Sequence, residues 1–125
     1  MTRRSVRVLV VEDDPNVRRD VSEVLDEEGY EVEQASHGVE ALERARARRP
    51  DVVLLDLYLP LMDGWALRNA LRTLDADRAP VIIVMTTDRY AHEEAKQLGA
   101  HGCLPKPFDL DDLLRLLAQV SIGAT

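Results

Sequence analysis

The stretch VVLLDLYLPLMDG, residues 52–64, decides how the rest of the chain can fold. It begins with four apolar residues, reaches a carboxylate at Asp56, and continues into a turn with Pro60, Asp63 and Gly64. An uninterrupted apolar run of this kind is typical of a strand buried on both faces of a parallel sheet. A charge at the carboxyl end of such a strand is costly unless it emerges where open α/β sheets bind ligands. Asp56 is therefore the first candidate for chemistry.

Apolar runs and helical periodicities alternate along the chain on both sides of this stretch. The first helix has clear limits, because Asp14 is a good N-cap, Pro15 suits the first helical turn and Gly29 can end it. Five such alternations with short connections predict one α/β domain with a doubly wound parallel sheet. Strands are expected at 6–11, 30–35, 52–56, 81–85 and 102–104, and helices at 15–28, 39–49, 65–74, 90–98 and 110–120.

Length and charge limit the possible classes of protein. The 125 residues suffice for one domain at 1–125, with a core at about 6–120 and a frayed tail at 121–125. The net charge of −7 disfavours a nucleic-acid-binding surface, and the basic run at 44–49 is more simply a solvated helix face. No apolar run is long enough for a membrane span or a signal peptide. With a single cysteine no internal disulfide can form, and we expect a cytoplasmic protein.

Polar side chains fall at the carboxyl ends of four expected strands. They are Glu12 and Asp13 after the first strand, Asp56 at the third, Thr86 at the fourth and Lys106 after the fifth. In a parallel sheet these positions share one edge, where three carboxylates would repel one another unless a hard cation such as Mg²⁺ bound them. An ammonium and a hydroxyl beside that metal complete a cradle for a phosphoryl group. Asp56 is then a candidate nucleophile that would form an acyl phosphate.

Each of these features has a simpler explanation when it is taken alone. An acidic pair after a strand most often caps a helix and faces solvent. A Lys-Pro pair usually marks a turn, and a threonine in a loop usually acts as a cap. Their coincidence at successive strand ends is what favours a phosphoryl-transfer site.

Four segments, in this order and spacing, resemble the response-regulator receiver domain of two-component signalling. They are VLVVEDDP at 8–15, DVVLLDLYLPLMDG at 51–64, VIIVMTT at 81–87 and GAHGCLPKPF at 99–108. The resemblance implies a flavodoxin-like sheet in the strand order 2-1-3-4-5, as in chemotaxis regulators. It also implies a phosphoacceptor that phosphorylates itself from phosphodonors and dephosphorylates itself, and not a turnover enzyme.

The resemblance implies a role for each residue at this sheet edge. Asp56 would accept a phosphoryl group from a sensor histidine kinase or a phosphotransfer protein. Mg²⁺, or Mn²⁺, would be bound directly by Asp13 and Asp56, through water by Glu12, and by the backbone carbonyl of Tyr58. Lys106 would pair with the phosphoryl group or, before phosphorylation, with Asp56.

The same resemblance implies how phosphorylation is read. Thr86 would move toward the phosphoryl oxygens, and the peptide bond between Lys106 and Pro107 would be cis. The face formed by the fourth helix, fifth strand and fifth helix would bind a downstream protein or an output domain, and could also form a homodimer. Neither nucleic acid nor a membrane is an expected direct partner.

Three departures from the family pattern concern this readout and not the acceptor chemistry. Cys103 stands three residues before Lys106, where the family has an aromatic switch residue. Thr87 replaces a small residue, and the segment 86–99 is slightly shorter than in common receivers. Tyr90 is a candidate substitute for the missing ring. We therefore expect ordinary acceptor chemistry with an unusual switch.

The resemblance implies that two further positions tune the lifetime of the phosphoryl group. Tyr58 lies two residues after Asp56, and Asp88 lies two residues after Thr86. The large ring of Tyr58 would screen an acyl phosphate from water. The change Tyr58→Ala should therefore speed its loss.

Two other classes of function stay open at this point. A phosphorylation-independent interaction module would explain Cys103, but not the complete set of acids together with Thr86 and Lys106. A phosphatase with an aspartate nucleophile needs a second acid two residues after it, where this chain has Tyr58. The domain could be a single-domain regulator or part of a longer protein.

Overall fold

The computed structural model describes residues 6–59, 61–74, 79–87 and 89–122, which form a five-stranded parallel sheet and the helices around it. The strand order β2-β1-β3-β4-β5 confirms the expected flavodoxin-like fold. Every expected strand and helix is present, with ends that differ by at most two residues. The strands are β1 (Arg7–Val11), β2 (Glu31–Ala35), β3 (Val52–Asp56), β4 (Val81–Thr86) and β5 (Gly102–Pro105), and the helices are α1 (Pro15–Glu27), α2 (Gly38–Ala47), α3 (Gly64–Leu74), α4 (Ala91–Leu98) and α5 (Leu110–Ile122).

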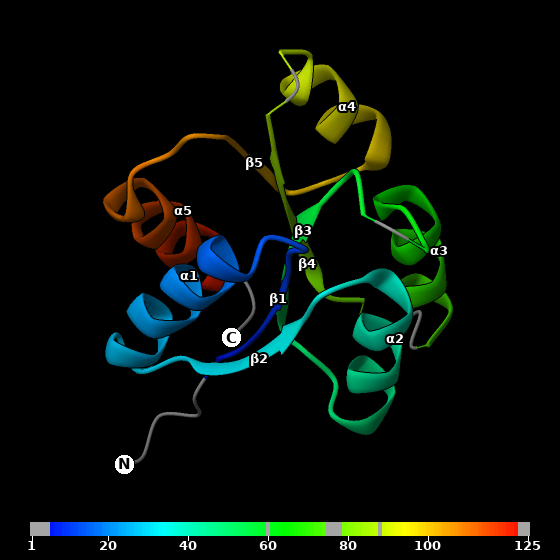
Figure 1. The fold of residues 1–125 in the computed structure, drawn as a ribbon, viewed down its shortest axis with the longest axis horizontal. Helices are drawn as coiled ribbons and strands as arrows, with labels where there is room; N and C mark the ends of the chain where they lie inside the picture. The colour runs from blue at the N-terminus through cyan, green and yellow to red at the C-terminus, as the bar shows by residue number, and fades with distance from the viewer. Residues whose placement is uncertain (1–5, 60, 75–78, 88, 123–125) are drawn as a thin grey trace.

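The helices cover both faces of the sheet (Figure 1). On one face, α2, α3 and α4 contribute residues such as Ala41, Leu67 and Leu98 to an apolar cluster with the strands. On the other face, α1 and α5 contribute residues such as Leu25 and Leu113 to a second cluster. All residues of β3 are buried, because this central strand is covered from both sides. The acid at its end therefore rests on the best-protected strand of the sheet.

A few residues determine how the chain passes from β1 into α1 and from β3 into α3. The carboxylate of Asp14 caps α1 by accepting hydrogen bonds from the N–H groups of Asn16 at 2.9 Å and Val17 at 3.4 Å. The N–H of Gly64 donates to the carbonyl of Leu57 at 2.9 Å. A Cβ atom on Gly64 would lie 2.9 Å from the Cα atom of Leu57, so only glycine lets α3 begin this close to the end of β3.

The structure also tests several smaller predictions made from the sequence. Gly29 follows α1 with a φ of 94°, a left-handed conformation that favours glycine and ends the helix as expected. Arg44, Arg46 and Arg48 are exposed, which confirms that the basic run is a solvated face. Asp88 and the tail residues 123–125 lie outside the described residues, whereas residues 121 and 122 of the expected frayed tail belong to the last turn of α5. In the described part of the chain, no helix has the length and apolar character needed to span a membrane.

Candidate functional site

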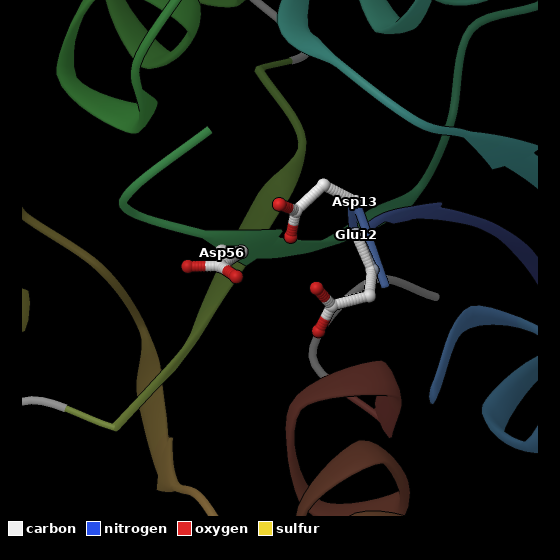
Figure 2. Close-up of side chains that lie close together, drawn as sticks. All are labelled: Glu12, Asp13 and Asp56. Atoms are coloured by element: carbon white, nitrogen blue, oxygen red, sulfur yellow. The ribbon is translucent and has the colours of Figure 1, made fainter. Parts of the chain in front are cut away.

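Three carboxylates meet at the carboxyl edge of the sheet, as the sequence predicted. Glu12 and Asp13 follow β1 and Asp56 ends β3, and Figure 2 shows their side chains turned toward one another. One oxygen from each carboxylate lies within 4.8 Å of the other two. Glu12 is 1% exposed and Asp56 is 8% exposed, whereas Asp13 is open to solvent. Like charges this close repel one another, so the cluster suits a bound cation.

Glu12 is held through its backbone as well as its carboxylate. Its N–H donates to the carbonyl of Ala35 at 3.1 Å, and its carbonyl accepts from Nη1 of Arg18 at 2.8 Å. The N–H of Asp14 donates to Oε2 at 3.2 Å, and the ammonium of Lys106 hydrogen-bonds to Oε1. Burial outweighs these contacts and raises the pKa of Glu12 above its ordinary 4.5.

Lys106 reaches the acids from the connection between β5 and α5. Its Nζ donates to Oδ2 of Asp56 at 3.2 Å as well as to Glu12, so one ammonium bridges two carboxylates. Its N–H donates to the carbonyl of Thr86 at 2.8 Å, and its peptide bond to Pro107 is cis, as the resemblance implied. Burial alone would lower the pKa of Lys106, but the hydrogen bond to Glu12 and the charge of Asp56 outweigh burial and raise it. Lys106 therefore stays positively charged at neutral pH.

Thr86 ends β4 at the same edge and is buried. In the sheet register Asp56 pairs with Met85, and Thr86 pairs with Pro105 of β5. Thr86 therefore lies one residue beyond the neighbour of Asp56, while Thr87 after it is exposed. The name strand-end site is used below for Glu12, Asp13, Asp56, Thr86 and Lys106.

The segment after Asp56 links the strand-end site to α4. The N–H of Tyr58 donates to Oδ1 of Asp56 at 3.1 Å. The Tyr58 side chain is 55% exposed, and its hydroxyl donates to Oε2 of Glu94 on α4 at 2.5 Å. Leu61 in the same loop has a φ of 70° and is also exposed. A single side chain thus connects the loop after the candidate nucleophile to a helix on one face of the sheet.

Cys103 occupies the position where the family has an aromatic switch residue. It is partly buried and packs against the apolar cluster that includes Ala95 and Leu98 of α4. Burial, with a smaller effect from the charge of Glu94, raises the pKa of the Cys103 thiol, so the thiol is uncharged at neutral pH. The eight residues of α4 make it the shortest helix in the described part of the chain.

Tyr90, the candidate substitute for the missing ring, points to the surface. Its side chain is 53% exposed, and the guanidinium of Arg89 lies 5.0 Å from the centre of its ring. Its hydroxyl accepts a hydrogen bond from Nη2 of Arg89 at 2.8 Å. Both contacts join Tyr90 to Arg89, in the loop before α4. That Tyr90 replaces the aromatic switch residue stays a prediction.

The donor set of the strand-end site fits a hard divalent cation. Carboxylate and carbonyl oxygens are the ligands that Mg²⁺ prefers, and Mg²⁺ usually keeps several waters. The exposed carboxylate of Asp13 leaves the cluster accessible to ions and water, while the buried Glu12 and Asp56 hold two further charges in place. The ammonium of Lys106, which bridges Glu12 and Asp56, is placed to bind an anionic group.

Three contacts around this site were not predicted from the sequence. Lys106 pairs with Glu12 as well as with Asp56. Glu94 accepts a hydrogen bond from the Tyr58 hydroxyl. Neither contact has a sequence signal, because both join segments far apart in the chain. The contact of Arg18 with the Glu12 carbonyl had a readable signal, because Arg18 lies one helical turn after the N-cap and so near the end of β1.

Comparison with known proteins agrees with this arrangement. The family model for the response regulator receiver domain matches residues 8–118. The chain is 41% identical over 111 residues to the response regulator MprA of Mycobacterium ulcerans, covering 88% of this chain and 47% of that protein. It is 35% identical over 107 residues to the sporulation initiation phosphotransferase F of Bacillus subtilis, covering 86% of each. The chain thus spans about half the length of MprA.

A solved structure adds information about the metal. The receiver domain of the sensor histidine kinase PA1611 from Pseudomonas aeruginosa PAO1 has a magnesium ion coordinated in its active site cleft. It is 29% identical to this chain with a TM-score of 0.82, and the match covers 94% of this chain and 99% of that one. The family match, the relatives, the order of strands in the sheet and the acidic cluster all indicate the same family. This chain belongs to the response-regulator receiver domain family.

Proposed function

We propose that this chain is a phosphoacceptor domain of a two-component or phosphorelay system. Asp56 would take a phosphoryl group from the phosphohistidine of a sensor histidine kinase or a phosphotransfer protein. The observation that carries the proposal is the position of Asp56, hydrogen-bonded by Lys106 at 3.2 Å and by the Tyr58 N–H at 3.1 Å, beside two more acids. The Bacillus subtilis relative is named a phosphotransferase, which supports this chemistry.

The residues of the strand-end site divide the work of the transfer. A carboxylate oxygen of Asp56 attacks the phosphorus atom, and the phosphorus–nitrogen bond to the imidazole breaks as the new phosphorus–oxygen bond forms. The imidazole leaves with the electron pair of the broken bond. The ammonium of Lys106 offsets the charge of the phosphoryl oxygens, and the hydroxyl of Thr86 donates a hydrogen bond to one of them.

A divalent cation is the expected cofactor of this site. We assign Asp13 and Asp56 as direct ligands, Glu12 as a ligand through water, and the carbonyl of Tyr58 as a further ligand. Bound there, Mg²⁺ or Mn²⁺ would neutralise negative charge on the transferring group. The magnesium ion in the PA1611 receiver supports the assignment.

The output of the domain, residues 1–125, is proposed to lie on the face formed by α4, β5 and α5. A downstream protein, an output domain or a second copy of the chain would bind there when Asp56 is phosphorylated. The net charge of −7 argues against direct contact with nucleic acid. A cytoplasmic location would give the domain access to the phosphohistidine that supplies it. Beyond its own phosphorylation and dephosphorylation we expect no turnover of a substrate.

Phosphorylation of the purified chain tests the proposal. The protein is incubated with acetyl phosphate and Mg²⁺, and the bound phosphoryl group is counted by intact-mass spectrometry. We expect one phosphoryl group on the wild type, none on Asp56→Asn, and none when Mg²⁺ is removed with a chelator. Asp109→Asn, which changes an exposed acid just before α5, should label like the wild type. Equal labelling of Asp56→Asn would contradict the proposal.

A phosphorylation-independent interaction module is the second candidate. The observation that favours it is the pair of features at α4, namely Cys103 in place of the aromatic switch residue and the eight-residue helix itself. Beryllofluoride with Mg²⁺ mimics a bound phosphoryl group and separates the candidates. If the protein binds no beryllofluoride, and Asp56→Asn loses no labelling, the module is the better description.

A further inference from the structure

Tyr58 makes one contact with the candidate nucleophile and another with α4. Its N–H donates to Oδ1 of Asp56 at 3.1 Å, and its hydroxyl donates to Oε2 of Glu94 at 2.5 Å. As long as Tyr58 keeps its rotamer, a shift of its backbone carries the ring and the hydroxyl with it. Residues far apart in sequence are thereby joined by hydrogen bonds that run from the end of β3 to the middle of α4.

Glu94 depends on this contact. Its residue is partly buried, and its second oxygen, Oε1, is buried without a hydrogen-bond partner among the described residues. A carboxylate in such a place is stabilised by the hydrogen bond that its other oxygen receives from Tyr58. Loss of that bond would favour a new position for Glu94 in which its oxygens reach water. The neighbouring Glu93 is exposed and lacks this constraint.

Glu94 also lies where α4 packs against β5. The next residue, Ala95, is buried in the apolar cluster against which Cys103 of β5 packs. The negative charge of Glu94 is close enough to affect the Cys103 thiol. A movement of Glu94 would therefore act next to the packed surface that α4 shares with β5. The name α4 junction is used below for Tyr58, Glu94 and Cys103.

We propose that the hydrogen bond between Tyr58 and Glu94 transmits the state of Asp56 to α4. This inference rests on the proposed function, since it requires that a phosphoryl group and a cation bind at the strand-end site. When the phosphoryl group and the cation bind at the strand-end site, the N–H of Tyr58 changes its hydrogen-bond partner and the Tyr58 ring shifts. Glu94 then either moves with the Tyr58 hydroxyl or loses its hydrogen bond to it. Glu94 is a positioning residue in this scheme and touches no reacting atom. Because Cys103 carries no ring, this side-chain contact is a route by which α4 would be coupled to Asp56.

The test measures the response of α4 to a phosphoryl mimic. Backbone amide chemical shifts of α4 (Ala91–Leu98) are recorded by NMR before and after saturation with Mg²⁺ and beryllofluoride. In Glu94→Ala the ligand-induced shifts of α4 should fall by at least about twofold, the lower end expected for a side chain that carries coupling. Glu94→Gln keeps an acceptor oxygen and should retain most of the response. Glu93→Ala, one position earlier on the helix, should respond like the wild type.

Tyr58→Phe completes the test by removing only the hydroxyl. The double variant with Tyr58→Phe and Glu94→Ala should lose no more of the α4 response than either single variant, since both remove the same contact. If Glu94→Ala melts α4 before ligand is added, the Tyr58→Phe and Glu94→Gln results decide. An unchanged α4 response in Tyr58→Phe overturns the inference.

The proposed function and this inference fail in different ways. Absence of beryllofluoride binding to the wild type would refute both, and would be seen directly in a binding titration. Binding to the wild type with no shift in α4, or with equal shifts in wild type and Glu94→Ala, would leave the acceptor function standing and refute the coupling. The coupling is supported by a response that is lost in Tyr58→Phe and kept in Glu94→Gln, and that is also lost in Glu94→Ala where α4 stays folded.

Discussion

The strand-end site is assembled from residues at or directly after the ends of buried strands, whereas the α4 junction is assembled from partly exposed side chains. Glu12 and Asp56 are 1% and 8% exposed, while Tyr58 is 55% exposed. Asp56 is the last residue of a fully buried strand, so its position is fixed by the packing on both faces of the sheet. The contact between Tyr58 and Glu94 is a single hydrogen bond between a loop and a helix.

Under the proposed function, this difference would separate the acceptor chemistry of the domain from its readout. A substitution at the strand ends acts on charges that the whole core holds in place. A substitution at the α4 junction removes one contact and leaves the core intact. The family resemblance described above implies the same division, because the acids, Thr86 and Lys106 are all present, while Cys103 stands where the resemblance implies an aromatic switch residue. The predictions below test whether the two regions are separable in this way.

Asp13→Asn should produce the largest effect, because it removes one of the three clustered charges without changing the shape of the side chain. Loss of an outer-sphere group alone weakens metal binding by about 10–100-fold, so loss of Asp13, which is proposed as a direct ligand, should weaken Mg²⁺ binding by at least about 100-fold. Asp13 is exposed and its loss relieves repulsion from Glu12 and Asp56, so the metal-free variant should be at least as stable to unfolding as the wild type. Calorimetric titration with Mg²⁺ and denaturant unfolding measure the two quantities.

The matched control lies on α4 and carries the same loss of charge. Glu93→Gln should leave the Mg²⁺ affinity within about twofold, because an exposed charge outside the cluster is largely screened by salt. If Glu93→Gln weakened Mg²⁺ binding as much as Asp13→Asn does, the affinity would depend on net charge and not on the strand-end site. The separation of the two regions would then be wrong.

The fold was predictable because its signals are local and repeated. The buried strands are short apolar runs, and the first helix is marked by Asp14, Pro15 and Gly29. The strand order itself came from the family resemblance and not from periodicity. The ends of elements shifted by one or two residues, for example at α3, which begins at Gly64 because that glycine packs against the backbone of Leu57.

The strand-end site was predictable for the same reason, since parallel strands bring their carboxyl ends to one edge. The α4 junction was not, because no periodicity or turn signal relates Tyr58 to Glu94. Which rotamer Tyr58 adopts, and which residue of α4 faces it, depends on how α4 packs on β5. The second partner of Lys106, Glu12, was missed for a similar reason, because a long flexible side chain can reach either of two neighbouring acids.

A smaller effect should appear in the pH dependence of Mg²⁺ binding. Burial raises the pKa of Glu12 above 4.5, so Glu12 takes up a proton at a higher pH than an ordinary glutamate does. The protonated form is neutral and attracts a cation less. As the pH falls through this raised pKa, the Mg²⁺ affinity should decrease, by at most about tenfold per pH unit for the uptake of one proton. Calorimetric titrations at successively lower pH, starting from neutral, would show it.

Glu12→Gln is the matching control, because glutamine keeps an acceptor oxygen for Lys106 but takes up no proton. Its affinity for Mg²⁺ should be lower than that of the wild type at neutral pH and should begin to fall only at a more acidic pH. Identical pH profiles for the two proteins would show that Glu12 does not control the dependence. The exposed Glu93 offers a second control, since Glu93→Gln should keep the wild-type profile.

The smallest effect is expected where the two regions meet, at Tyr58. Removing the ring in Tyr58→Ala should speed the loss of the phosphoryl group from Asp56, because water gains access to the acyl phosphate. A side chain that is 55% exposed can shield the site only in part, so we expect less than about tenfold, which is under about 1.4 kcal/mol of barrier. Tyr58→Phe keeps the ring and should decay like the wild type while losing the contact with Glu94. The decay, measured by loss of labelled phosphate, therefore separates shielding by the ring from coupling by the hydroxyl. If Tyr58→Phe loses the phosphoryl group as fast as Tyr58→Ala, the contact with α4 and not the ring sets its lifetime. The strand-end site and the α4 junction would then not be separable.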